Sequence, residues 1–294
     1  MKITLYIIIC SFRAEWEKRE NMYIRKLLAI LGMYGVILCA LCGCQKTADS
    51  TVVDYEELPV IIVGSDNYPP FKYEDADGNA TGIDVDLATE AFRRMGYKAR
   101  FVCINWEDKD TLLANGSVDC VWGSFSINGR ENEYRWAGPY MVSQQVVAVN
   151  VNSDIYKLSD LEDKTIAVQI TTKPEELFLN RTDERIPSIR SLIALQDREL
   201  IYPVLSKGYV DGIAAHKTAI KQYMKDYDIE FRILDEPLLN VGLGVAFDKN
   251  DVRGLDVELT QMLNQMRLDG TQRKILEKYL DDVDEYLEVE DYEK

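Results

Sequence analysis

The sequence contains very few histidines and cysteines and is short of positive charge. One histidine and six cysteines occur in 294 residues, and 34 Lys and Arg residues are outnumbered by 50 Asp and Glu residues. The net charge of −16 would repel a phosphate backbone, so we do not expect nucleic acid as a partner. The cysteine spacing matches no metal site, and we expect neither a metal nor a cofactor. Cys103 and Cys120, inside apolar runs, could form a disulfide or stay as two buried thiols.

The N-terminal region lacks an apolar run of membrane-spanning length. Residues 27–42 are apolar and follow Arg25 and Lys26, but a spanning helix needs roughly 20 residues, so the run predicts a secretion signal. The segment Leu41-Cys42-Gly43-Cys44 is similar to a bacterial lipobox, in which small residues precede the cysteine that receives the lipid. The alternative is a short apolar helix with ordinary cysteines.

The N-terminal region divides further by composition. Residues 1–21 fit no signal design, which indicates that the true start is Met22. Residues 22–43 are then the signal peptide, and residues 44–57 form a polar tether behind lipidated Cys44. We expect an exported protein anchored to the outer face of the bacterial cytoplasmic membrane, because two acyl chains give stable attachment.

From residue 58 onward, short aliphatic runs alternate with amphipathic stretches. A helix is predicted over residues 83–96, with Asp84 as its N-cap and Gly96 just after its end. Such alternation is typical of an α/β fold in which helices flank a mostly parallel sheet. The expected strands are 59–66, 99–106, 118–125, 164–170 and 210–216, and the other expected helices are 108–116, 173–181, 197–208, 255–270 and 271–280.

Two long β-like runs interrupt this alternation. Residues 140–154 and 240–251 contain no helical pattern, which suggests that the chain crosses twice between two lobes. Lobe 1 is expected to contain residues 58–147 plus 245–282, and lobe 2 residues 148–244. Residues 283–294 are acidic and are expected to form a solvated tail without fixed structure.

Two segments repeat one pattern at the entry of a predicted strand. Gly116-Ser117-Val118-Asp119 and Gly208-Tyr209-Val210-Asp211 share the glycine, the valine and the aspartate. Small ligands bind beyond the carboxyl ends of parallel strands, so residues 123–126 and 215–216 are expected at one crevice between the lobes. The repeat also has a simple structural explanation, because a glycine, a turn and an inward valine recur wherever a helix leads into a strand.

Four short motifs occur together in the chain: "YPPF", "GIDVDLA", a "GPY" turn and "DGT" near the C-terminus. With them the exported part resembles the amino-acid-binding receptors of bacterial ABC importers, solute-binding protein family 3. The resemblance implies a periplasmic-binding-protein-like fold with two lobes and two hinge crossovers. It also implies a small-molecule ligand between the lobes and an ABC permease as partner, and we expect a monomer.

The resemblance assigns ligand-binding residues on the first lobe. The family holds the ligand side chain between aromatic residues, which match Tyr68 and Trp106, although both could be ordinary partly buried aromatics. An arginine after the third strand binds the ligand carboxylate and matches Arg130. The loop before Arg130 is one residue shorter than the usual pattern, so a surface arginine is the alternative. Ser124 and Ser126 match positions that give backbone and hydroxyl hydrogen bonds.

On the second lobe the family binds the ligand at the start of a helix. Thr171, in place of the usual glycine, and Thr172 match these positions. Thr172 or Lys173 could also cap the helix, which is compatible with ligand binding. The single histidine, His216, stands where many members have an aspartate that pairs with the α-ammonium group of the ligand. An imidazole with a pKa near 6.5 would shift ligand affinity between pH 6 and 7, and a histidine that caps the next helix outside the pocket is the alternative.

The sequence favours a non-catalytic receptor for an amino acid or a related polar metabolite. The alternative is an enzyme on the same fold, similar to cyclohexadienyl dehydratase, or a sensor binding module. No arrangement of His, Asp, Ser or Cys has the spacing of a nucleophile with its base, so we expect no enzyme and no catalytic residues.

Overall fold

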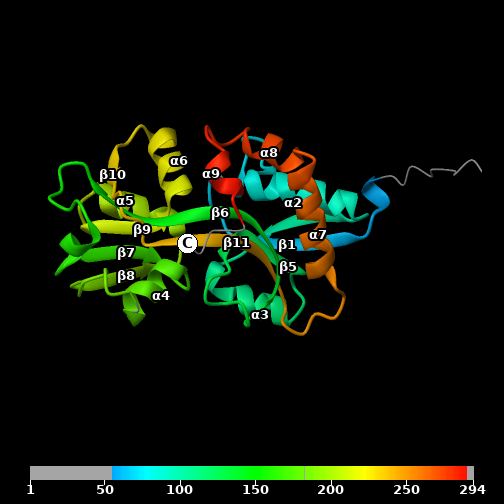
Figure 1. Cartoon of the computed structure of the whole chain (residues 1–294), viewed down its shortest axis with the longest axis horizontal. Helices are drawn as coiled ribbons and strands as arrows, with labels where there is room; N and C mark the ends of the chain where they lie inside the picture. The colour runs from blue at the N-terminus through cyan, green and yellow to red at the C-terminus, as the bar shows by residue number, and fades with distance from the viewer. Residues whose placement is uncertain (1–54, 182, 290–294) are drawn as a thin grey trace, which may run out of the picture. The chain divides into compact units, whose positions relative to one another are not determined.

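The computed structural model describes residues 55–181 and 183–289; the predicted signal peptide, Cys44 and most of the predicted tether lie outside these ranges. Within them, nine strands form one sheet in the order β4-β1-β5-β11-β6-β9-β7-β8, with β10 paired to β6 (Figure 1). No helix of this part of the chain combines the length and apolar character needed to cross a bilayer. The strands of the sheet are β1 (Val60–Ser65), β4 (Lys98–Cys103), β5 (Cys120–Ser126), β6 (Arg135–Asn150), β7 (Thr165–Gln169), β8 (Ser191–Leu195), β9 (Gly212–His216), β10 (Phe231–Ile233) and β11 (Leu239–Phe247).

The sheet consists of two parallel groups joined by two long antiparallel strands. Strand β1 pairs in parallel with β4 and β5, and β7 pairs in parallel with β8 and β9. Between these groups, β6 and β11 pair antiparallel with each other and with their outer neighbours β9 and β5. We call β4, β1 and β5 with their helices the first half, and β9, β7 and β8 with theirs the second half. The predicted α/β fold class with two crossovers is confirmed, and β6 and β11 are the crossovers.

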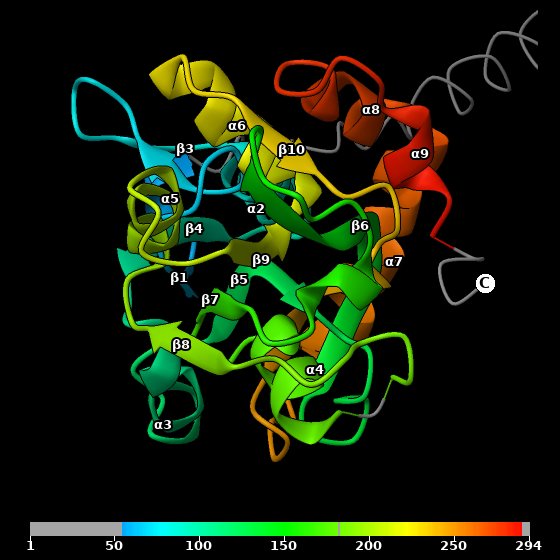
Figure 2. The ribbon, with the colours of Figure 1, turned by 90° about the vertical axis from the view of Figure 1, so that its left-hand side faces the viewer.

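Helices cover both faces of each half. In the first half, α2 (Ile83–Arg94), α7 (Leu255–Leu268) and α8 (Thr271–Leu276) pack on one face, and α3 (Lys109–Ala114) packs on the other. In the second half, α4 (Lys173–Asn180) lies on the opposite side of the strands from α5 (Ile201–Ser206) and α6 (Lys217–Tyr227), as Figure 2 shows. Each half therefore has its own apolar core on both faces of its strands, which is typical of parallel sheets.

The start of α2 differs from the sequence prediction. The N-cap is Gly82, with a φ of 124°, and not Asp84. A side chain at Gly82 would place its Cβ 2.4 Å from the carbonyl oxygen of Phe71, so glycine is required there. Asp84 instead lies inside the protein with 1% of its surface exposed. The predicted helix is confirmed over Ile83–Arg94, and the glycine after its end is confirmed, since Gly96 has a φ of 83°.

The C-terminal segment is ordered further than its composition suggests. Helix α9 (Asp284–Leu287) follows α8, and Val283 and Tyr286 belong to the core of the first half. Val289 is buried as well. The expected lack of fixed structure is therefore wrong for residues 283–289. These three apolar residues recur every third position, so one face of the segment is apolar although most of its residues are acidic.

The two cysteines of the described part are free thiols. Cys103 ends β4 and is exposed, whereas Cys120 begins β5 and is buried. The sequence left open a disulfide or two buried thiols. The structure has two free thiols, of which Cys120 is buried and Cys103 is exposed. Burial raises the pKa of the Cys120 thiol well above its usual range, so this side chain behaves as a small apolar residue.

Candidate functional site

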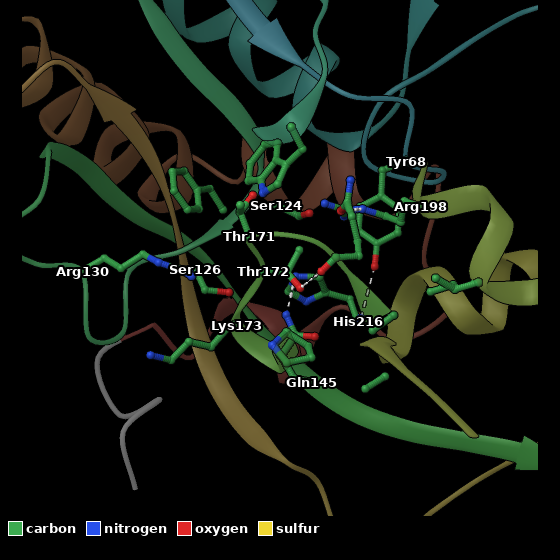
Figure 3. Close-up of a pocket in the computed structure, with 17 residues that line it drawn as sticks. Tyr68, Ser124, Ser126, Arg130, Gln145, Thr171, Thr172, Lys173, Arg198 and His216 are labelled. Carbon is green, nitrogen blue, oxygen red and sulfur yellow. Dashed lines mark hydrogen bonds between the residues drawn. The ribbon is translucent and has the colours of Figure 1, made fainter. Parts of the chain in front are cut away.

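A small polar pocket lies at the carboxyl ends of β5, β7 and β9, between the two halves (Figure 3). Its volume is about 30 Å³, which is room for roughly two water molecules, so the pocket is narrow in this structure. All eight residues that the sequence proposed for ligand binding line it: Tyr68, Trp106, Ser124, Ser126, Arg130, Thr171, Thr172 and His216. The other lining residues are Phe125, Gln145, Gln169, Lys173, Pro174, Arg198, Ile201, Ala214 and Ala215.

Aromatic side chains form the wall on the first half. Trp106 and Phe125 meet edge to face, with their ring centroids 5.0 Å apart, and both are buried. The indole Nε1–H of Trp106 has no hydrogen-bond partner within the described residues. The hydroxyl of Tyr68 accepts a hydrogen bond of 3.2 Å from the backbone N–H of His216, which joins the two halves directly.

Ser124 holds a strained backbone conformation at the floor of the pocket. Its φ of 48° lies in the left-handed region, which costs a non-glycine residue roughly 1–3 kcal/mol. Its backbone N–H donates to Asp84 Oδ2 at 2.8 Å, and the Tyr140 hydroxyl donates to Asp84 Oδ1 at 2.8 Å. Burial raises the pKa of Asp84 to about 7 despite these donors. The Ser124 hydroxyl has no partner in the described chain and is available to a ligand.

Two cations reach the pocket from opposite halves. Arg130 lies over the Phe125 ring, 5.5 Å from its centroid, so the short loop does not keep it out of the pocket. Arg130 Nη2 is 3.3 Å from one oxygen of Glu176, and Lys173 Nζ is 2.7 Å from the other. One half-exposed carboxylate is thus shared by two cations, so Glu176 alone does not neutralise both Arg130 and Lys173.

At the start of α4, the backbone N–H of Thr171 is already hydrogen-bonded to a side chain of α4 itself. Thr171 has a φ of 56°, and its backbone N–H donates to Glu175 Oε2 at 2.5 Å. Thr172 occupies the N-cap position, but its side chain does not cap the helix, because the hydroxyl donates to the Gln169 carbonyl at 2.6 Å. The alternative that Thr172 caps α4 is therefore wrong. A ligand anion at this helix start would have to replace the Glu175 carboxylate.

His216 lies in the pocket but has no free ring nitrogen. Nδ1 is 2.9 Å from the Ser143 hydroxyl, and Nε2 is 2.8 Å from Nε2 of Gln145, which can donate to it. Burial, reinforced by the charge of Arg198, lowers the pKa of His216 to about 3. With this pKa the imidazole is neutral at pH 6 and at pH 7 alike, so this residue gives no reason to expect an affinity shift between them. His216 directly precedes α6, but its side chain makes no cap hydrogen bond and lines the pocket, so the alternative of a capping histidine outside the pocket is wrong.

The sequence missed a buried cluster around Arg198. The Arg198 guanidinium lies 3.5 Å from the centroid of the Tyr68 ring, and its Nη2 is 3.2 Å from Asp66 Oδ2. Gln169 accepts from Arg198 Nε and donates to Asp66 Oδ2 at 2.9 Å. The rule that ligands bind beyond the carboxyl ends of parallel strands could have found these residues. Asp66 directly follows β1, Gln169 ends β7, and Arg198 follows β8 by three residues.

The pocket offers no metal site. Across residues 55–181 and 183–289, no three His, Cys, Asp or Glu side chains lie close enough together to hold a metal ion. The charged residues that line the pocket are Arg130, Lys173 and Arg198, and no carboxylate lines it. The arrangement is suited to hold an acidic or acceptor-rich small molecule by hydrogen bonds and charge.

Two sheet halves joined by two long strands, with a polar pocket built from both, define a solute-binding protein. Residues 60–282 match the bacterial extracellular solute-binding proteins, family 3, and the chain belongs to this family. Glutamate-binding protein GluB of Corynebacterium glutamicum is 25% identical over 280 residues, which cover 90% of this chain and 92% of GluB. The histidine-binding periplasmic protein of Salmonella typhimurium is 31% identical over 75% of this chain and 87% of its own length.

A solved structure extends the comparison. The ancestral amino acid-binding protein AncCDT-1, a precursor of cyclohexadienyl dehydratase, is 28% identical and superposes with a TM-score of 0.66. The match covers 75% of this chain and 95% of that protein. The relatives are thus amino-acid-binding proteins, and one of them precedes an enzyme.

Proposed function

We propose that this protein is an exported receptor that binds an amino acid or a related small polar metabolite and delivers it to the permease of an ABC importer. The observation that carries the proposal is that one pocket takes residues from both halves. Tyr68, Trp106, Ser124 and Arg130 come from the first half, and Thr171 and His216 come from the second. A ligand that contacts both groups would favour the closed arrangement, which the permease would recognise.

We further propose that the two halves move as lobes about β6 and β11. These are the strands that join the two parallel groups, so bending them opens the pocket without breaking either core. In this proposal lobe 1 contains residues 58–147 plus 245–282, and lobe 2 contains residues 148–244. Small-angle scattering with and without ligand should show a smaller radius of gyration in the bound state, and an unchanged value would contradict the movement.

A thermal-shift screen tests the binding proposal. The purified protein would be screened against the amino acids, their N-acyl and keto derivatives, and small organic acids. We expect at least one compound to raise the melting temperature and to change the fluorescence of buried Trp106. The receptor proposal would be abandoned if no compound of these classes bound.

An enzyme is the second candidate, because the chain resembles a precursor of a dehydratase. The lining residues argue against it, since no carboxylate lines the pocket and His216 is neutral with both ring nitrogens engaged. General acid–base chemistry needs a group that exchanges protons near pH 7 within reach of the ligand. Incubation of the best ligand with the protein, followed by NMR, should return the ligand unchanged, whereas a product would favour the enzyme.

Membrane attachment through Cys44 is part of the proposal. We expect the wild-type protein to fractionate with membranes of the producing bacterium and to carry acyl chains at Cys44. A Cys44→Ser variant should appear in the medium or periplasm without lipid. The purified variant should sediment as a monomer.

A further inference from the structure

Arg198 occupies a complete cation-binding site inside the pocket. Its guanidinium lies over the face of Tyr68 and 5.6 Å from the centroid of Trp106. The Asp66 carboxylate forms an ion pair with it, and the Gln169 amide oxygen accepts a hydrogen bond from Arg198 Nε. Aromatic faces and a carboxylate are the groups that recognise an organic cation, and here the protein supplies the cation itself.

The cluster holds the guanidinium firmly. Arg198 and Asp66 are 6% and 7% exposed, so loss of either would leave the other charge buried without its partner. Asp66, Tyr68 and Trp106 belong to the first half, whereas Gln169 and Arg198 belong to the second. A ligand cation could use Asp66 only by displacing Arg198, because Asp66 does not line the open pocket.

The remaining polar groups of the pocket favour an acid. Arg130 and Lys173 add two cations, and the carboxylates near them, Glu175 and Glu176, are bound to the Thr171 amide and to these cations. Two buried groups that can donate, Trp106 Nε1 and Ser124 Oγ, have no partner in the described chain. Among the fully buried side-chain atoms of the lining residues, Gln145 Oε1 and the Ser124 hydroxyl can accept a hydrogen bond from a ligand, and neither carries a full charge.

We propose that Arg198 determines specificity by filling the cation subsite, so that the pocket takes a small carboxylic acid without a charged nitrogen. The inference rests on the proposed ligand-binding role of this pocket. A carboxylate would meet three cations, which already have carboxylate partners in the protein, and two free donors. An ammonium group would meet the same cations and two neutral oxygens, of Gln145 and Ser124. Keto acids, dicarboxylic acids and N-acylated amino acids share this chemistry.

Matched ligand pairs test the proposal on the wild-type protein. Glutamate is compared by calorimetry with 2-oxoglutarate and with N-acetylglutamate, which retain both carboxylates and differ at the nitrogen. We expect one of the two uncharged forms to bind at least tenfold more tightly than glutamate. Equal or tighter binding of glutamate, arginine or lysine would overturn the role of Arg198 and leave the receptor proposal standing.

Removing Arg198 should open the cation subsite. We expect Arg198→Ala to gain binding of arginine and of guanidinium itself, from undetectable in the wild type to a dissociation constant in the millimolar range or below. Adding Asp66→Asn should abolish the gain, because the carboxylate is then absent. Arg198→Met keeps the apolar stem and serves if the alanine variant does not fold. Arg190→Ala is the matched control, since Arg190 pairs with Asp163 on the surface of the same half.

The outcomes separate the two proposals. A folded Arg198 variant that binds no cation would refute the cation subsite, whatever the wild type binds. If no acid or amino acid binds the wild type, the receptor proposal fails, while guanidinium binding by the variant would still support the subsite.

Discussion

The two segments that repeat the glycine, valine and aspartate pattern are equivalent in backbone and different in chemistry. Asp119 accepts from the Ile62 N–H at 2.8 Å and donates its own N–H to the Ile62 carbonyl. Asp211 makes the same pair of bonds with Thr165, at 2.7 Å for the side chain. Each aspartate thus joins its strand to the neighbouring parallel strand, β1 or β7.

The two segments differ five residues beyond each aspartate, near the end of each strand. This position holds Ser124 in β5 and His216 in β9, and both side chains line the pocket. Ser124 has a strained backbone and an unused hydroxyl, whereas the His216 ring is bonded at both nitrogens. The pattern at the strand entry therefore serves the fold, and the residue at the strand end distinguishes how each half meets a ligand.

The largest expected effect is on the pH dependence of stability, which should involve His216 but not Ser124. His216 has a pKa of about 3 in the folded protein and about 6.5 when unfolded, so the unfolded state binds an extra proton below pH 6.5. Stability from this group is therefore present above pH 6.5 and is lost as pH falls toward 3. Relative to His216→Gln, the wild type should lose about 3 kcal/mol between pH 7 and pH 4 in urea unfolding.

Ser124→Ala is the control for this measurement. Tyr68, Ser143, Gln145 and Arg198 surround the imidazole, and Ser124→Ala leaves all of them in place. The stability difference between this variant and the wild type should not change with pH. A constant difference for His216→Gln as well would show that the imidazole is not held neutral.

The second effect tests whether Asp119 and Asp211, which directly precede β5 and β9, stabilise the two halves equally. Asp119→Ala and Asp211→Ala each remove the acceptor of a backbone N–H, and each should lower the free energy of unfolding by about 2 kcal/mol. The ion pair of Asp119 with Arg253 is partly exposed and should add little. Asp154→Ala, at an exposed ion pair with Lys164, should stay within about 0.5 kcal/mol. If the losses in the free energy of unfolding for Asp119→Ala and Asp211→Ala differed greatly, the two strand entries would not be equivalent.

The third effect concerns ligand charge at the strand end. His216→Asp places a carboxylate where the pocket has none, so affinity for an amino acid with a free ammonium should rise at least tenfold, or about 1.4 kcal/mol. Calorimetry with glutamate and 2-oxoglutarate measures the change. His216→Asn, which adds no charge, should leave the preference between the two ligands unaltered.

The smallest effect concerns the glycines that open both segments. Gly116 and Gly208 have φ values of 73° and 72°, and an added Cβ would meet no atom of the described structure within 4 Å. Replacement by alanine should therefore cost only backbone strain, about 1 kcal/mol at each position. Thermal unfolding should show equal losses, with smaller ones for asparagine, which tolerates this conformation.

Much of the fold could be read from the order of residues. The helices and strands follow local periodicity, and the positions beyond strand ends were placed at one pocket correctly. Two local interpretations failed for a physical reason. Asp84 looked like a helix cap but is buried under Ser124 and Tyr140, and the apolar face of residues 283–289 was hidden by their acidic neighbours.

The sequence by itself determined the α/β alternation and the two crossovers, because periodicity is a local property of the chain. The strand-end rule placed residues 123–126 and 215–216 at one crevice, and the resemblance to the family supplied the full set of eight proposed ligand-binding residues. Only the tertiary structure decided what the pocket contains. Asp66 and Arg198 are far apart in the chain and meet only when the halves come together. The neutral state of His216 likewise depends on burial and on the nearby guanidinium, which no local pattern records.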